Sequence, residues 1–316
     1  MRKFIEGLPK AELHLHLEGS MEPATLAELD PSVSIEEAER MYRYPDFAGF
    51  LASYVWAVRK LTEPEQYALI ARRLLERLHL QNVLYAEITL SAGVILWRKQ
   101  DLSAVYQALR EEAAKSPVQV YWVFDSVRQF GVELAQTVAE HAVAHADNGV
   151  VAYGIGGDEE KGPAKWFNEV FAFTKRNRLR AVPHAGETVG PQSVWDALEL
   201  GADRIGHGIT ASQDEALIRH LREANIPLEI CISSNVCTGV VPSLQDHPVR
   251  RLYDAGVPII LNSDDPPMFQ TTLNGEYEIA AREFSFSDTE LRGLAENSFR
   301  YAFRYNRTNQ PLRYIP

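Results

Sequence analysis

Eight short apolar runs, each of strand length, recur along the chain and are separated by segments with the spacing of amphipathic helices. Several runs are apolar throughout rather than alternating, which is typical of parallel strands covered on both faces. The runs occupy residues 12–16, 83–90, 118–127, 150–157, 180–184, 204–207, 228–233 and 258–263. Helical spacing is clear over residues 64–80, 192–200 and 213–224. This alternation predicts an α/β fold, a closed (β/α)8 TIM barrel.

The segment between the first two runs is too long for one crossover helix. We expect additional helices there, including one over residues 47–61, and a last helix over residues 287–305. Four apolar side chains share one face of the helix at 47–61; they either pack on the barrel, the simpler interpretation, or form a wall of a substrate pocket. They are Phe47, Phe50, Leu51 and Tyr54. Because no linker or repeat interrupts the pattern, we predict a single barrel domain over residues 1–316.

The overall charge argues against polyanionic partners. The 316 residues carry a formal net charge of -11, which disfavours binding to nucleic acid or to an anionic membrane surface. A small, roughly neutral molecule fits better as the substrate. The first residues lack the apolar stretch of a signal peptide, no apolar run is long enough to span a bilayer, and only two cysteines occur. These features predict a cytoplasmic protein.

Polar side chains with metal-binding chemistry stand where four of the apolar runs end. They are His14 and His16, then His184, then His207, and finally the pair Asp264 and Asp265. The two histidines at i and i+2 of a strand project to the same side. In a barrel of this kind the carboxyl ends of the strands form one rim, where the chemistry takes place. We therefore expect these groups to meet.

Three neutral imidazoles and a carboxylate make a suitable shell for one divalent transition metal, and zinc favours this mixture of ligands. Each residue taken alone has a structural interpretation. A lone His184 is more often a buried rim histidine than a ligand, Asp264 fits a turn or a helix cap, and Glu187 fits a cap of the next helix. Their occurrence together at matching strand ends favours the metal site.

The motifs that contain these residues resemble the adenosine deaminase family of the amidohydrolase superfamily, from Leu8 through Asp265. They are Lys-Ala-Glu-Leu-His-Leu-His-Leu-Glu-Gly at 10–19, Gly-Gly-Asp-Glu at 156–159, His-Ala-Gly-Glu at 184–187, Gly-His-Gly at 206–208, Ser-Ser-Asn at 233–235 and Ser-Asp-Asp-Pro at 263–266. The resemblance implies one zinc ion per chain. Its ligands would be His14, His16, His184 and Asp264.

The resemblance also implies how a purine is held and attacked. Glu187 would protonate a ring nitrogen, and His207 would help to deprotonate and orient the water bound by the metal. Asp265 would hold another ring nitrogen, and Gly157 would offer its backbone amide to the ring. His16 is expected to face the substrate as well as the ion, and Asp264 to act in catalysis as well as in binding the ion.

One position departs from the adenosine pattern. The residue after His-Leu-His-Leu is usually an aspartate that contacts ribose, whereas here it is Glu18. Glutamate there resembles the adenine deaminase branch, because the longer carboxylate reaches into the space of a sugar. A third branch acts on 6-amino-6-deoxyfutalosine, an adenine nucleoside with an extended aromatic 5' substituent. The aromatic side chains of Tyr54, Trp56 and Trp97 would suit that substrate, although they fit a core equally well.

We therefore expect hydrolytic deamination at C6 of a 6-aminopurine nucleoside, either adenosine or a modified adenosine, with free adenine as the alternative. Two other functions are open: a metal hydrolase of another substrate class, and a binding protein without activity. The first would not require Glu187 beside His184 together with Asp265, and the second should have lost a ligand or the acid. Relatives that bind two metals usually bridge them with a modified lysine on the fourth strand; the fourth run here has none, so the resemblance implies a single ion.

Overall fold

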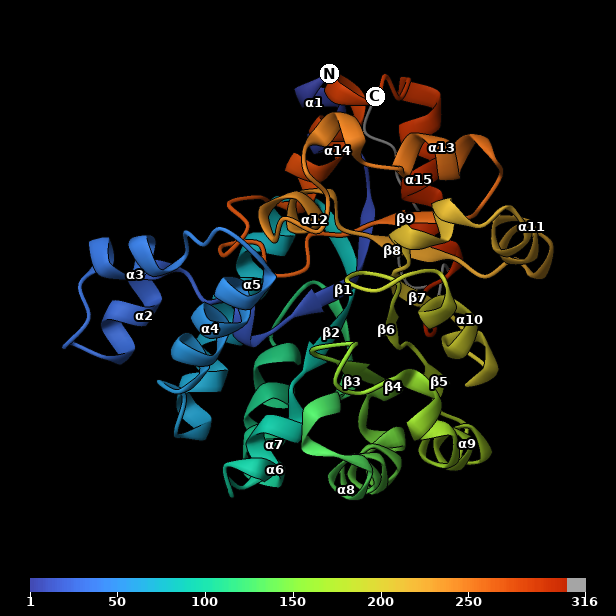
Figure 1. The fold of residues 1–316 in the computed structure, drawn as a ribbon. Coiled ribbons are helices and arrows are strands. Elements are labelled where there is room, and N and C mark those ends of the chain that lie inside the picture. Colours follow the sequence, from blue (N-terminus) through green and yellow to red (C-terminus); the bar gives the residue numbers. More distant parts are fainter. Residues whose placement is uncertain (306–316) are drawn as a thin grey trace.

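A ring of parallel strands forms the centre of the computed structural model, which describes residues 1–305, and helices surround that ring (Figure 1). Strands β1 to β5 pair in order in one sheet, and β6 to β9 pair in order in a second. The strands are β1 Lys10–His16, β2 Val83–Leu90, β3 Gln119–Val127, β4 Val150–Gly156, β5 Arg180–Ala181, β6 His184–Ala185, β7 Ile205–His207, β8 Leu228–Ile230 and β9 Ile259–Leu261. A parallel bridge between Leu15 and Asp264 joins the first strand to the last.

The prediction of a (β/α)8 barrel is confirmed. The run at 180–184 forms two short strands, β5 and β6, rather than one. Pro183 lies between them, and a proline has no N–H to donate to a strand ladder. Every residue of β4 is buried, as expected for a parallel strand covered on both faces.

Helices cover the outside of the ring and leave its rim to loops and short extra helices. The outer helices are α5 Pro64–Leu80, α7 Leu102–Ala113, α8 Val132–Ala144, α9 Asn168–Arg176, α10 Gln192–Glu199, α11 Glu215–Ala224, α13 Val249–Asp254 and α15 Asp288–Arg300. The others are α1 Arg2–Gly7, α2 Pro23–Leu29, α3 Ile35–Met41, α4 Phe47–Val58, α6 Ala92–Trp97, α12 Ile232–Cys237 and α14 Leu273–Glu283. The main apolar core combines strand residues such as Ile88 with helix residues such as Leu74. Within residues 1–305, no helix is long and apolar enough to cross a bilayer.

The additional helices predicted between the first two strands are present as α2, α3 and α4, which project from one side of the barrel in Figure 1. Helix α4 begins at Phe47 as expected and ends at Val58 rather than at 61. Its N-cap, Asp46, accepts a hydrogen bond from the N–H of Gly49 at 2.8 Å, which fixes this start.

Two further predicted boundaries are wrong. The run at 228–233 ends as a strand at Ile230, and residues 232–237 form α12, because an apolar run alone does not distinguish a strand from a buried helix. The last helix begins after the N-cap Ser287 as expected but ends at Arg300. Residues beyond it turn under the barrel instead, where the carbonyl of Tyr301 accepts a hydrogen bond from Arg204. The predicted single domain of 1–316 extends past the described residues.

Candidate active site

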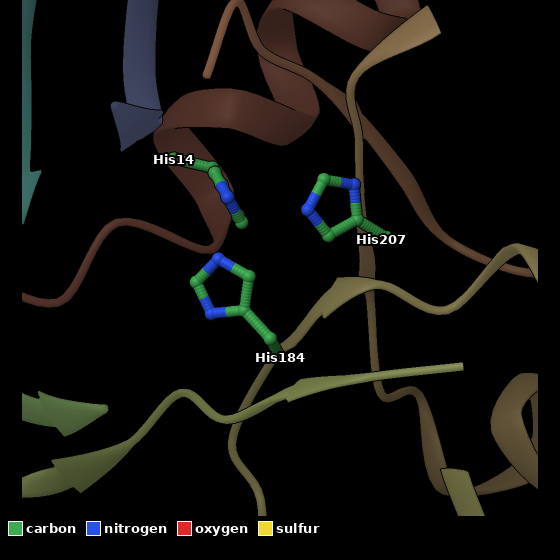
Figure 2. Close-up of side chains that lie close together, drawn as sticks. All are labelled: His14, His184 and His207. Atoms are coloured by element: carbon green, nitrogen blue, oxygen red, sulfur yellow. The ribbon is translucent and has the colours of Figure 1, made fainter. Parts of the chain in front are cut away.

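The rim formed by the carboxyl ends of the strands gathers the predicted polar residues. His14 and His16 lie at the end of β1, His184 begins β6, His207 ends β7, and Asp264 follows β9. Figure 2 shows the imidazoles of His14, His184 and His207 pointing toward one another. The structure thus brings side chains from the first, fifth, sixth and last barrel segments to one place.

Backbone pairing across the junction of β1 and β9 sets the position of Asp264. The N–H of His16 donates to the carbonyl of Asp264 at 3.0 Å, and the N–H of Asp264 donates to the carbonyl of His14 at 3.1 Å. Asp264 has a φ of 62° and His207 a φ of 59°, both in the left-handed region. Such a conformation costs a residue other than glycine about 1 kcal/mol, so the fold stores backbone strain at two residues of this rim.

Three pairs of the predicted donor atoms are spaced as a metal shell would require, and donor atoms of His14, His184 and His207 also lie within 4.8 Å of one another. Nε2 of His16 lies 3.3 Å from Nε2 of His184 and 3.3 Å from Oδ1 of Asp264, and Nε2 of His14 lies 3.4 Å from the same oxygen. Ligands placed tetrahedrally about 2.0–2.1 Å from a zinc ion are separated from one another by roughly 3.3 Å. The residues present therefore fit a transition-metal ion, and Nε2 of His14 has no hydrogen-bond partner among the described residues.

The charges around His14 favour a cation at this position. Burial lowers the pKa of His14, but its close contacts with the carboxylates of Asp264 and Glu229 more than offset this effect and leave the pKa well above its usual value. His14 and its two carboxylate partners are all almost completely buried. Two buried carboxylates beside one imidazole leave an excess of negative charge, which a divalent cation would neutralise.

A buried series of charged side chains contacts His14 through its Nδ1 atom. Nδ1 of His14 lies 2.8 Å from Oε2 of Glu229, and the other oxygen of Glu229 accepts from Arg204, which also pairs with Glu87. Histidines that bind metals usually donate their second ring N–H to such a carboxylate, which fixes the ring orientation. The guanidinium of Arg204 lies 3.8 Å from the centre of the Phe303 ring. We call His14, Glu229, Arg204 and Glu87 the support chain.

Glu187 lies beside the same group of donors and is 8% exposed. Burial raises the pKa of Glu187 well above its usual value, and the negative charges of Asp264 and Glu159 add to the effect. Its Oε1 lies 3.7 Å from Nε2 of His207. These surroundings favour the protonated form of Glu187, which can donate a hydrogen bond or a proton.

The loop that carries Glu187 is fixed by another acid. The carboxylate of Glu159 accepts hydrogen bonds from the N–H groups of Gly186, Glu187 and Thr188, at 2.8, 2.8 and 2.9 Å. It also accepts one from the hydroxyl of Ser193. The hydrogen bonds to Glu159 thus fix the position of the residues that follow β6.

Asp265, the residue after Asp264, lines the same cavity. Burial raises the pKa of Asp265 well above its usual value, and the charge of Asp264 reinforces this shift. Gly19 leaves the space that its side chain occupies, because a Cβ on Gly19 would lie 1.4 Å from Oδ1 of Asp265. Only glycine at 19 is compatible with this position of Asp265.

These groups face one cavity of about 230 Å³. The predicted residues among its lining are His16, His184, Glu187, His207, Asp264, Asp265 and Gly157. Apolar side chains of α4 line it as well, namely Phe47, Phe50, Leu51 and Tyr54. The pocket-wall interpretation of this helix face is therefore correct, and the simpler packing interpretation is incomplete.

Glu18 lies outside that lining. It is 1% exposed, and its Oε1 accepts a hydrogen bond from the N–H of Ser91 at 3.0 Å. Burial raises the pKa of Glu18 to about 7. The hydroxyl of Tyr54 lies 2.9 Å from that of Ser91, so Tyr54 and Glu18 meet on one serine at the cavity wall.

The three aromatic residues singled out in the sequence have different surroundings. Tyr54 lines the cavity. Trp97 is 60% exposed and stacks on Phe130, with ring centres 5.1 Å apart and planes 11° apart, and Phe130 lines the cavity. Trp56 packs against the core and lies under the ammonium group of Lys60.

Sequence reasoning missed Asp125, a carboxyl in β3 that lines the cavity. It is 4% exposed, and its Oδ1 has no hydrogen-bond partner among residues 1–305. Burial raises the pKa of Asp125 to about 8. The only signal in the sequence was an acid inside an apolar run, two residues before the end of β3 at Val127.

Comparisons with known proteins agree with this site. The family model described as adenosine deaminase matches residues 9–313. The aminodeoxyfutalosine deaminase of Streptomyces avermitilis is 41% identical over 318 residues, which cover 96% of this chain and 88% of that protein. The adenine deaminase of Rhizobium johnstonii is 34% identical over 314 residues, covering 96% and 98%.

A solved structure extends the likeness to the fold. The adenine deaminase from Arthrobacter aurescens superposes with a TM-score of 0.90 at 27% identity and covers 96% of this chain and 97% of that one. The family model spans nearly all of the sequence, and the relatives match along almost their whole length. The chain belongs to the adenosine deaminase family.

Proposed function

We propose that this chain is a zinc-dependent hydrolase that replaces the amino group at C6 of a purine nucleoside by oxygen and releases ammonia. The observation that carries the proposal is the position of Glu187. This buried carboxyl, with its raised pKa, lines the same cavity as three imidazoles and the carboxylate of Asp264. Attack on an aromatic ring requires a proton donor for a ring nitrogen, whereas hydrolysis of a simple ester does not.

We infer that one Zn²⁺ per chain is held by His14, His16, His184 and Asp264, whose donor atoms lie at the separations given above. When bound, zinc supplies a Lewis acid that lowers the pKa of a water molecule to about 7. The remaining site residues bind the purine, orient the water and move protons.

Glu187 acts as the acid in this proposal. Addition of water at C6 places electron density on the adjacent ring nitrogen, and Glu187 donates its proton there. Burial raises the pKa of Glu187, which favours the protonated form that this step requires. The attacking water loses both of its protons as its oxygen becomes the 6-oxo group: one reaches the C6 amino group, which leaves as ammonia, and the other restores the proton of Glu187.

The ring is held in the cavity by residues on either side of Glu187. The carboxyl of Asp265, with its raised pKa, donates a hydrogen bond to a second ring nitrogen, and the N–H of Gly157 binds the ring edge. His16 faces the ring, and His207 and the second oxygen of Asp264 orient the attacking water. Nε2 of His207 lies 3.8 Å from that oxygen.

A nucleoside is favoured over free adenine by the position of Glu18. A glutamate that reached into the space of a sugar would exclude a nucleoside, but this side chain binds the N–H of Ser91 outside the cavity lining. The stacked pair of Phe130 and Trp97 adds an aromatic surface beside the cavity. Relatives named aminodeoxyfutalosine deaminase, 41% and 37% identical, support 6-amino-6-deoxyfutalosine as the preferred nucleoside. We place the enzyme in the cytoplasm, since both cysteines are free thiols.

The test compares ammonia release from 6-amino-6-deoxyfutalosine, adenosine and adenine by the zinc-loaded protein. We expect the highest kcat/KM on 6-amino-6-deoxyfutalosine. A preference for adenine would support the free-base alternative. If none of the three released ammonia, the deaminase proposal would be wrong.

A further inference from the structure

A line of hydrogen bonds connects the backbone of α13 to the candidate active site. The N–H of Val249 donates to Nδ1 of His247 at 3.2 Å. Nε2 of His247 lies 3.1 Å from Oδ1 of Asn235, and Nδ2 of Asn235 lies 3.1 Å from Nδ1 of His207. All of these side chains are at most 4% exposed.

The backbone N–H at the start of this line fixes the direction of every bond that follows. An N–H can only donate, so Nδ1 of His247 is an acceptor and its proton is on Nε2. Nε2 then donates to an oxygen of Asn235, which turns the NH2 group of Asn235 toward His207. Nδ1 of His207 must accept. Reversing the Asn235 amide would bring two N–H donors face to face in a buried place, which costs free energy.

From this geometry we propose that Asn235 and His247 lock His207 as the tautomer with its proton on Nε2. Its catalytic consequence rests on the function proposed above. Asn235 and His247 are positioning residues, because they act on the reaction only through His207. The Ser-Ser-Asn motif at 233–235 thereby gains a role that the sequence did not assign.

The locked tautomer decides what His207 does in the cavity. Its Nε2 faces Oε1 of Glu187 at 3.7 Å and Oδ2 of Asp264 at 3.8 Å. A nitrogen that already carries a proton donates a hydrogen bond and cannot accept another proton. His207 therefore holds the attacking water by donating to its oxygen and is not the base that deprotonates it.

Local structure fixes the positions of Asn235 and His247 in this line of hydrogen bonds. Asn235 lies on the short helix α12, where its N–H donates to the carbonyl of Cys231 at 3.1 Å and its carbonyl accepts from the N–H of Val241 at 2.9 Å. His247 packs edge-on against the ring of Phe284. Burial lowers the pKa of His247 to about 3, so this residue is neutral with a single ring proton at pH 7.

The direct test is ¹⁵N NMR of the zinc-loaded protein labelled in its histidines, with the His207 signals assigned by their loss in His207→Gln. We expect Nε2 of His207 to resonate as a protonated nitrogen and Nδ1 as an unprotonated one. The opposite assignment, or a doubly protonated ring at pH 7, would overturn the proposal. This measurement needs no substrate, so its result does not depend on whether the protein deaminates purines.

A variant that reverses the direction of the hydrogen bonds tests the role of Asn235. Asn235→Asp is nearly isosteric but offers only acceptors, so the His207 proton should move to Nδ1. A wrong histidine tautomer lowers kcat in a serine protease by about 10⁴; here we expect a loss of kcat of at least about 100-fold with little change in KM. If Asn235→Asp kept both the wild-type tautomer and the wild-type kcat, this line of hydrogen bonds would have no such role.

Two substitutions of His247, one that keeps its hydrogen bonds and one that removes them, form a matched pair of variants. His247→Gln retains an oxygen to accept from Val249 and an NH2 group to donate to Asn235, so both tautomer and kcat should stay near those of the wild type. His247→Leu removes both groups and frees the Asn235 amide to reverse, so the spectrum should show a second His207 species. Equal spectra and rates for the two variants would contradict the proposed anchor.

Discussion

Three neighbouring carboxyl groups in this cavity differ in charge because their surroundings differ. Hydrogen bonding and proximity to His14 hold the pKa of Asp264 well below its usual value despite burial. Burial, with the charge of Asp264 nearby, raises the pKa of Asp265 and of Glu187. Surroundings that favour the ionised form of Asp264 and the protonated forms of Asp265 and Glu187 suit a cavity that both binds a cation and donates protons.

Replacing the proposed acid tests this division of roles. Glu187→Gln keeps the shape and the hydrogen-bond donor of a protonated glutamate but has no proton to transfer. We expect kcat to fall by about 10²–10⁴, the range typical of a lost general acid. Metal content, measured by atomic absorption, should match that of the wild type. Full activity in this variant would exclude Glu187 as the acid.

Gly19 gives a steric test of Asp265. Gly19→Ala places a methyl group 1.4 Å from the present position of Oδ1 of Asp265, so that side chain must move. We expect a large rise in KM for the purine with zinc retained, measured by initial rates and by metal analysis.

The control is Gly7→Ala, because no atom lies within 4 Å of a Cβ at Gly7. Gly7 ends helix α1, where alanine should leave activity unchanged and alter the free energy of unfolding by at most about 1 kcal/mol. A similar rise in KM in both variants would show that the effect is not specific to Asp265.

At the scale of elements, the strand ends were predictable and the connections were not. His14, His184 and His207 lie at or near the ends of apolar runs, Asp264 follows one, and the barrel rule alone brings such positions to one rim. The sequence could not show that the run containing Cys231 turns into a helix after Ile230. The residues that form α12 are apolar and then polar in a pattern that fits either structure.

The residues that lie near the proposed ligands without binding the ion could not be predicted from the sequence either. Asp125 lies inside an apolar strand, and Glu229 and Arg204 pair only because β7 and β8 are neighbours. Such contacts depend on which strands pair and with what register, information that periodicity does not contain. Asn235 and His247 meet for the same kind of reason, across the loop between α12 and α13.

The loop after β6 depends on Glu159, and this dependence is testable. Glu159→Gln replaces an oxygen by an NH2 group, which cannot accept from the N–H groups that now bind it. We expect kcat to fall by about tenfold or more, because one lost charge-assisted hydrogen bond costs about 1.5–3 kcal/mol.

The neighbouring Glu160→Gln is the control, since Glu160 is exposed. Circular dichroism of both variants should match that of the wild type. Equal rates for Glu159→Gln and Glu160→Gln would show that Glu159 does not position the loop that carries Glu187.

On the scale of the whole molecule, the end of the barrel opposite the site holds a buried lysine. The ammonium of Lys10 donates to the carbonyls of Ile5 and Leu8 at 2.8 and 2.6 Å. Burial lowers the pKa of Lys10 to about 7, from the 10.5 of an exposed lysine. Between these two pH values the unfolded chain binds one more proton than the folded chain, so stability rises with pH.

This effect can be isolated in urea unfolding at pH 7 to 10. The free energy of unfolding of the wild type, minus that of Lys10→Met, should increase with pH by up to about 1.4 kcal/mol per pH unit. Lys115→Met, at an exposed lysine, should show no such trend. A pH-independent difference for Lys10→Met would mean that Lys10 keeps its proton in the folded protein.

The support chain also ties the candidate site to the last described residues. Arg204 donates to the carbonyl of Tyr301, and Glu87 accepts from the N–H of Phe303 at 2.7 Å. His14 is thus supported, through Glu229, Arg204 and Glu87, by a segment that lies far from it in the sequence. We therefore expect removal of residues 301–303 to loosen the support chain and to weaken the hold of Glu229 on the ring of His14.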